Sequence, residues 1–261
     1  MLDPKNTLAD AALQVVGSRW RINHFTYLDE DTGFVYLSAP ASANIRTVGS
    51  LKKGVAQVRG EALELSNLKQ VVGRKDGVIA NPKAAGFTVF NQMLIDESVI
   101  KFAFVRDPVE RFVANYRNRY SMSVKHSAQR VKLFAELGMP LEEDLSMLDL
   151  AELFTEEEGL IDLVPHLVPQ RKLIAFDLLD YSFIGRHESW DEDYPRISME
   201  IFGCETPVFD PVKALNIDPE GTNLHTHVDE DTRAELEEVY AEDYDMIAEI
   251  EELFPDGFAA E

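Results

Sequence analysis

The amino-acid sequence predicts an α/β fold in which a parallel sheet is flanked by helices. Two similar units carry this prediction. In the first, the apolar run at residues 34–37 precedes a loop of small residues and then a helical pattern. In the second, the run at residues 102–105 breaks at Arg106-Asp107-Pro108, and a helical pattern follows again. Short runs of aromatic and branched residues are typical of buried strands, and parallel strands need helical connections between them.

The first unit has the layout of a phosphate-binding loop. A weakly amphipathic stretch predicts a helix within residues 1–23, and the strand at 34–37 follows an acidic turn. The loop 38–44 reads Ser-Ala-Pro-Ala-Ser-Ala-Asn, and a helix is expected from about Asn44. Helix N-termini attract anions, so this arrangement is P-loop-like. The chain contains neither GxxxxGK[ST] nor GxGxxG, so this is not a standard nucleotide loop, and an ordinary turn is the alternative.

The second unit has the clearer helix start. Asp107 suits the N-cap, Pro108 the first helical position, and Glu110 would complete a capping box. Arg106 is then expected at the carboxyl end of a central strand, where open α/β sheets bind ligands. Residues 101–132 hold eight Lys/Arg against two acids, or +6, in a chain of net charge −22. This cationic island favours an anionic ligand, although Arg106 and Asp107 could form only an ion pair and a cap.

The remaining elements follow from hydrophobic periodicity and helix-start signals. The Arg side chains at 111, 117 and 119 are expected to be solvated helix charges. Ser189 and Glu192 predict a capping box, and Asp243 falls on an apolar helix face, where a carboxylate needs a buried partner. Helices are expected within residues 62–68, 84–95, 128–137, 141–163, 189–202 and 229–253, and short strands within 77–80 and 177–185.

Length and composition limit the class of protein. The 261 residues suit a single domain over 1–261. A pI near 4.6 argues against nucleic acid as a partner. The single cysteine, Cys204, excludes an internal disulfide and is expected in the core. No signal peptide or membrane-spanning run is apparent, so we expect a soluble, cytoplasmic protein without stable membrane insertion, and no His/Cys/Asp cluster indicates a metal site.

Four segments, in order, resemble the PAPS-dependent sulfotransferases, and in particular their carbohydrate sulfotransferase branch. PAPS is 3′-phosphoadenosine 5′-phosphosulfate. The segment FVRDPVERFVANYRNRY looks like the family's 3′-phosphate-binding segment, and FVYLSAPASANIRTV stands in the place of its 5′-phosphosulfate loop. Downstream, HLVPQRKLIAFDLLDYSFIGRHESWDED and VYAEDYDMI are similar to later family segments. The recognisable core covers about residues 34–250.

The resemblance implies the sulfotransferase fold and a reaction in which a sulfonyl group moves from PAPS to a hydroxyl of a carbohydrate or other small acceptor, without a metal. Arg106 would bind the 3′-phosphate, while Ser38, Ser42 and Asn44 would hold the 5′ end of the nucleotide. The family's loop lysine is replaced by Ala39, and its serine after the Arg by Ala114. Arg46 is the candidate substitute cation. A non-catalytic descendant that keeps a nucleotide or sulfated-ligand pocket is the alternative.

The reaction also needs a group that accepts the proton of the acceptor hydroxyl. His166, between Pro165 and Leu167 in an apolar segment, is the candidate catalytic base. A hydrogen-bonded structural histidine is the alternative reading of this residue. His225 and His227 lie in a polar stretch, and a surface role is expected for both.

Overall fold

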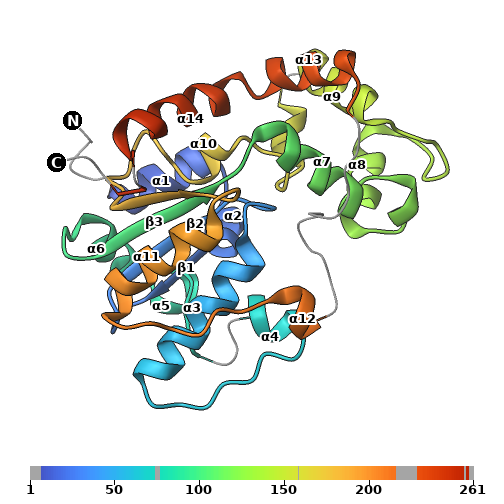
Figure 1. The fold of residues 1–261 in the computed structure, drawn as a ribbon. Coiled ribbons are helices and arrows are strands. Elements are labelled where there is room, and N and C mark those ends of the chain that lie inside the picture. Colours follow the sequence, from blue (N-terminus) through green and yellow to red (C-terminus); the bar gives the residue numbers. More distant parts are fainter. Residues whose placement is uncertain (1–6, 74–76, 158, 216–227, 256, 259–261) are drawn as a thin grey trace.

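Four strands form one mixed sheet in the spatial order β1-β2-β3-β4 (Figure 1). The computed structural model describes residues 7–73, 77–157, 159–215, 228–255 and 257–258. β2, β3 and β4 run parallel, and β1 pairs antiparallel with β2. The predicted α/β class is confirmed, but the sheet is mixed rather than purely parallel. The strands are β1 (Thr26–Asp29), β2 (Phe34–Ser38), β3 (Ile100–Val105) and β4 (Phe183–Arg186).

Helices cover both faces of the sheet because successive side chains of β2 and β3 point to opposite faces. Phe102 and Phe104 of β3 pack with Phe34 and Tyr36 of β2 against α3 (Asn44–Val58) and α11 (Trp190–Phe202). Ala103 of β3 faces the other way. On that side lie α1 (Leu8–Val16), α2 (Arg19–Phe25), α6 (Phe87–Ile95), α10 (Gln170–Leu173) and α14 (Ala241–Leu253).

A third apolar cluster joins four helices at the end of the sheet where β3 leads into α7 (Figure 1). These helices are α7 (Pro108–Arg119), α8 (Ala128–Leu137), α9 (Met147–Glu156) and α13 (Glu230–Val239). The N-terminus of α7 directly follows the carboxyl end of β3, at the edge of the sheet where ligands bind in open α/β folds.

The N-terminal helix is divided into α1 and α2. Gly17 ends α1 with φ 85°, and Ser18 starts α2 by accepting a hydrogen bond from the N–H of Arg21. The helix predicted within 62–68 is wrong, since a shorter helix, α4 (Leu68–Val72), begins only after Asn67. The strand predicted at 77–80 is reduced to one bridge between Leu28 and Ala80. The helix predicted at 84–95 is broken at Gly86, which separates α5 (Pro82–Ala85) from α6.

In the second half, α8 matches its predicted bounds, whereas the helix predicted over 141–163 contains only α9 and the 3₁₀ turn η2 (Leu160–Leu163). The strand expected within 177–185 corresponds to β4, which begins only at Phe183. The terminal helix is divided at Tyr240 into α13 and α14. The other short elements are η1 (Met122–Val124) and α12 (Pro211–Leu215).

Two predicted capping boxes are wrong. Asp107 does cap α7, accepting from the N–H of Glu110, but the N–H of Asp107 donates to Glu188 rather than to Glu110. Ser189 makes no side-chain cap, because its hydroxyl donates to Asp193. Cys204 is half-buried rather than in the core. In the described part of the chain, no helix has the length and apolar character needed to span a bilayer.

Candidate active site

The loop that joins β2 to α3 is held in a tight, unusual backbone conformation. Ala41 and Ala43 have φ values of 63° and 57°, in the left-handed region. An alanine in this region costs roughly 1–2 kcal/mol, and such residues concentrate at ligand-binding sites. A further turn is closed by the N–H of Ser42, which donates to the carbonyl of Ala39 at 3.2 Å. The loop therefore has a fixed shape that its sequence alone would not favour.

This conformation leaves the N-terminus of α3 open. The N-cap is Ala43, and no side chain caps the helix. The N–H groups of the first helical turn have no acceptor inside the helix, and they carry the positive end of the helix dipole. Helix α3 has 15 residues, so the dipole is well developed. An open N-terminus in a tight loop is suited to bind a phosphate or sulfate group.

Arg106 lies directly beside this loop. It follows the last residue of β3, and its Nη1 donates to the carbonyl of Ala41 at 3.1 Å. The guanidinium also lines a cavity of about 390 Å³ together with Ala43, Arg46 and Trp190, which we call the Arg106 cavity. The structure thus brings together the two segments that the sequence predicts to bind an anion, the loop 38–44 and Arg106.

Gln170, at the start of α10, connects these two segments. Its Oε1 accepts hydrogen bonds from the Ser42 hydroxyl at 3.0 Å and from the N–H of Arg106 at 2.9 Å, while its Nε2 donates to the carbonyl of Arg106 at 2.8 Å. All three residues are buried. Buried polar networks with this degree of satisfaction rigidify their surroundings. Gln170 therefore fixes the distance between the loop and the end of β3.

Asp243 on α14 holds Gln170 in turn. Its carboxylate accepts from the N–H groups of Gln170 and Arg171 at 2.9 and 2.8 Å. Burial raises the pKa of the Asp243 carboxyl, and the Arg111 guanidinium, 4.0 Å away, acts in the opposite direction. The prediction that Asp243 finds a buried partner is confirmed.

Arg111 is fully buried, so its predicted solvated position is wrong. Its guanidinium donates to the carbonyls of His166 and Val168 at 3.2 and 2.7 Å. These bonds anchor the backbone of the segment that carries His166. The arginine side chain is thus a structural support beneath the candidate base.

His166 lies beside the loop in a buried position. Its ring packs edge-on against Phe25, with centroids 5.8 Å apart, and its side chain is 7% exposed. Burial, together with the nearby charges of Arg119, His24 and Arg111, lowers the pKa of His166 well below the usual value. The imidazole is therefore neutral at pH 7, which is the form that can accept a proton. Its Nδ1 is buried and makes no hydrogen bond within the described residues.

His166 faces a second cavity of about 190 Å³, the loop cavity, on the same side as Pro40, Ala41 and Asn44. Asn44 is the first residue of α3, and its Oδ1 is buried without a partner in the described chain. Ser38, at the end of β2, is also buried, and its hydroxyl has no hydrogen-bond partner among the described residues. These orphaned polar atoms fit a polar ligand at the loop.

The other two predicted nucleotide ligands point elsewhere. The Ser42 hydroxyl donates to Gln170 and its N–H donates to the carbonyl of Ala39, so both of its donors are already used within the protein. The Arg46 guanidinium lies 3.8 Å over the ring of Trp190 and pairs with Asp191, inside the Arg106 cavity rather than the loop cavity. Arg46 therefore lies on the Arg106 side of the loop, away from the loop cavity.

The cation that does reach the loop cavity is Arg119, which the sequence placed among the solvated charges. Arg119 lies on the last turn of α7, is half-buried, and its Nη1 donates to Asn115 at 2.9 Å. Burial lowers the pKa of Arg119. Because the ordinary pKa of an arginine is far above 7, the side chain keeps its positive charge. The sequence could have indicated this position of Arg119 through spacing. Arg111, Asn115 and Arg119 stand at i, i+4 and i+8, so they lie on one face of the helix.

The described residues contain no group of three His, Cys, Asp or Glu side chains that could hold a metal ion, and His225 and His227 lie outside them.

Comparison with known proteins identifies the family of this chain. A sequence model of the sulfotransferase family matches residues 2–247. No curated protein and no solved structure matches the chain. The match covers nearly the whole chain, including the loop, Arg106, His166 and Gln170, and by it the chain belongs to the sulfotransferase family.

Proposed function

We propose that this sulfotransferase moves a sulfonyl group from PAPS to a hydroxyl of a carbohydrate or another small acceptor. The observation that carries the proposal is the contact between Arg106 and the loop at the open N-terminus of α3, with Nη1 3.1 Å from the carbonyl of Ala41. This contact supports the proposal, because it joins an arginine to a loop at an open helix N-terminus, and both elements are suited to anions. A nucleotide with phosphates at both its 3′ and 5′ positions is a ligand that needs two such elements.

The donor supplies an activated sulfonyl group and an anionic leaving group. Arg106 would hold the 3′-phosphate, because a guanidinium binds phosphate through two parallel hydrogen bonds. The N–H groups of the first turn of α3 and the Ser38 hydroxyl would hold the 5′ end, and Ser38 and Asn44 have the orphaned polar atoms that such a ligand would satisfy. Arg46 on Trp190 would form the outer wall of the nucleotide site.

Arg119 would stabilise the charge that develops in the reaction. Sulfonyl transfer is, by analogy with phosphoryl transfer, an in-line displacement in which negative charge grows on the leaving phosphate. The loop 38–44 has no lysine for this task. The residue at the position of the family's lysine is Ala39, and its side chain is buried in the core. Arg119 lines the loop cavity with Pro40, Ala41 and His166, so its charge lies on the required side of the loop.

His166 would accept the proton of the attacking hydroxyl. Its lowered pKa keeps the ring neutral at pH 7, and Arg111 holds its backbone in place. The charges of Arg119 and Arg111 add to the effect of burial, so the arginines around the site also help to keep the base unprotonated. General bases of this kind contribute about 10²–10⁴-fold to rate.

A specific observation favours the second candidate, a non-catalytic member of the family that retains the nucleotide pocket. Ala39 and Ala114 stand where the family usually has a lysine and a serine, and both side chains are buried. In this reading the open N-terminus of α3 and Arg106 still bind the nucleotide, but Arg119 and His166 support no turnover.

Thermal unfolding with PAP, the desulfated nucleotide, followed by a transfer assay with labelled PAPS and a panel of hydroxylated acceptors, tests both candidates. A ligand at a hundred times its Kd stabilises the folded state by about 2.7 kcal/mol. We expect a shift with wild type, none with Arg106→Ala, and an unchanged shift with Arg233→Ala on the exposed side of α13. No shift in wild type would exclude both candidates, and a shift without transfer would favour the second.

A further inference from the structure

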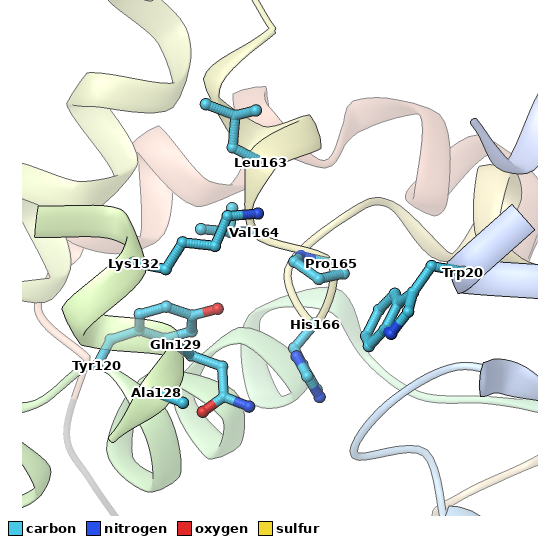
Figure 2. Close-up of a pocket in the computed structure, with 9 residues that line it drawn as sticks. All are labelled: Trp20, Tyr120, Ala128, Gln129, Lys132, Leu163, Val164, Pro165 and His166. Carbon is cyan, nitrogen blue, oxygen red and sulfur yellow. The ribbon is translucent and has the colours of Figure 1, made fainter. Parts of the chain in front are cut away.

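A third pocket shares His166 with the loop cavity. It has a volume of about 370 Å³ and is formed by α2, α8, the end of α7 and the segment that leads to His166 (Figure 2). We call it the Trp20 pocket. Figure 2 shows Trp20 on one side and Tyr120 and Gln129 on the other, with His166 between them. Of the residues that the structure describes, His166 alone lines both this pocket and the loop cavity.

We propose that the Trp20 pocket binds the acceptor, and that the acceptor is a hydroxylated six-membered ring that carries a carboxylate. The proposal rests on the proposed function, because it takes the loop cavity as the place of the donor. Because His166 lines both cavities, an acceptor in the Trp20 pocket and a donor in the loop cavity would meet at the imidazole. The ring could then take the proton of the acceptor hydroxyl as its oxygen attacks sulfur.

The requirement for a hydroxyl comes from two orphaned polar atoms. The Tyr120 hydroxyl and His166 Nδ1 are both buried, and neither has a hydrogen-bond partner in the described chain. Burial raises the pKa of Tyr120, so its hydroxyl keeps its proton and remains a donor. In Figure 2 this hydroxyl is directed towards the side where Pro165 and His166 lie. A ligand hydroxyl that accepts from Tyr120 and donates to His166 satisfies both atoms.

The requirement for a ring comes from Trp20. Its indole is 52% exposed, an unusual position for so large an apolar surface, and its ring stacks on His24 with centroids 4.6 Å apart. The stack holds the indole rigidly at the edge of the pocket. A rigid, exposed indole is a platform for the apolar face of a pyranose or of an aromatic ring.

The requirement for a carboxylate comes from charge. In a chain of net charge −22, none of the residues that line the Trp20 pocket is acidic. Lys132 of α8 lines it with an ammonium group that makes no hydrogen bond or ion pair within the described residues. The pocket is therefore a local site of positive charge that favours an anionic substituent.

In the proposed step the acceptor oxygen forms a bond to sulfur while the bond from sulfur to the phosphate oxygen breaks. The hydroxyl proton passes to His166, and the electron pair of the broken bond leaves with the nucleotide phosphate. No oxidant or metal is needed for the balance.

Calorimetric titration of the full chain, without donor, tests the pocket. The probes are methyl glucuronide and 4-hydroxybenzoate, each with its neutral counterpart, methyl glucoside and phenol. We expect one anionic probe to bind at least tenfold more tightly than its neutral counterpart. Preference for the sugar acid would identify a pyranose acceptor, and preference for the benzoate a phenolic one.

Three variants separate the contributions. Trp20→Ala should lower the affinity for the bound probe at least tenfold, and Tyr120→Phe should lower it about fivefold. Lys132→Gln should abolish the preference for the anionic probe over its neutral counterpart. Lys213→Gln, an exposed lysine on α12, is the control with the same change of charge. The PAP shift should persist in all four, which distinguishes failure of this proposal from failure of the donor site. No binding of any probe, or binding unaffected by Trp20→Ala and Lys132→Gln, would overturn the proposal.

Discussion

The side-chain amide of Gln170 pairs with the main chain of Arg106 as a neighbouring strand would. The N–H of Arg106 donates to Oε1 at 2.9 Å, and Nε2 donates back to the carbonyl of Arg106 at 2.8 Å. The residues are 64 positions apart, and the pair lies where β3 ends. Because Oε1 also accepts from Ser42, one amide sets the position of the loop relative to the arginine.

Replacing this amide should therefore damage both stability and nucleotide binding. Gln170→Leu leaves the buried N–H and carbonyl of Arg106 and the Ser42 hydroxyl without partners. Each unsatisfied buried group costs about 1–3 kcal/mol, so we expect the free energy of unfolding in urea to fall by several kcal/mol. The PAP shift of the folded fraction should also be lost.

Gln57→Leu is a suitable control, since the Gln57 amide donates to the carbonyl of Glu205 at an exposed site. A Gln170→Leu protein with wild-type stability and an unchanged PAP shift would show that the amide does not position the site.

The starts of the two strand–loop–helix units could be predicted because their signals are local. Asp107 and Pro108 mark the beginning of α7 within three residues of the end of β3, and the apolar run of β2 stops at the loop. By contrast, the sequence analysis did not predict β1, which has only four residues. Its partner β2 could be recognised from its own apolar run, and nothing in that run indicates an additional antiparallel neighbour. Short edge strands carry little periodicity of their own.

The connections across the site could not be predicted, because they depend on packing. Gln170 was visible only as part of a motif, and nothing local indicates that its amide reaches Ser42 and Arg106. Arg119 looked like one more charge on a basic helix, yet the contacts of α7 with α8 and α13 turn its face towards the loop. Asp243 could be predicted to need a partner from its apolar surroundings, but not that the partners are the N–H groups of Gln170 and Arg171.

Arg119→Gln should separate binding from turnover. If Arg119 stabilises charge that grows on the leaving phosphate, its loss should lower kcat about 10²–10³-fold. The KM for PAPS should change little, because the ground-state phosphates of the donor are held by Arg106 and the α3 N-terminus. Steady-state kinetics with PAPS, with Arg117→Gln on the same helix as the control, would measure this. A rise in the KM for PAPS as large as the fall in kcat would instead make Arg119 a ligand of the ground-state donor.

The acidic limb of the activity profile should lie at unusually low pH. Burial and nearby cations lower the pKa of His166, so the ring remains neutral as pH falls through 6.5, where an ordinary histidine would take up a proton. kcat/KM should therefore stay constant between pH 7.5 and about 6. NMR titration of the His166 ring protons provides the independent measurement. Titration of this ring near pH 6.5, with a parallel fall in rate, would contradict the assignment.

The same shift predicts how stability depends on pH. Below pH 6.5 the unfolded chain protonates this histidine while the folded chain does not, so the unfolded state binds more protons and stability falls as pH falls. His166→Phe should remove this contribution, and urea unfolding at several pH values between 5 and 7 would detect the difference in slope. An identical slope in wild type and His166→Phe would show that the ring titrates alike in both states.

Restoring the family's loop lysine should not restore a cation to the site. Ala39 is fully buried against the core beneath the sheet, with Val35 and Leu37 of β2 in the same cluster. A lysine there would have to bury its charge without a partner, displace the core or lose its proton. We expect Ala39→Lys to lower the free energy of unfolding by at least about 3 kcal/mol and to leave transfer no faster than wild type.

Ala39→Leu separates the two causes of that loss, because it adds volume without charge, and overpacking alone costs about 1–3 kcal/mol. Urea unfolding of both variants beside wild type would give the difference due to charge. A stable Ala39→Lys protein with faster transfer would mean that the side chain reaches the loop cavity after all, and that Arg119 does not occupy the place of the missing lysine.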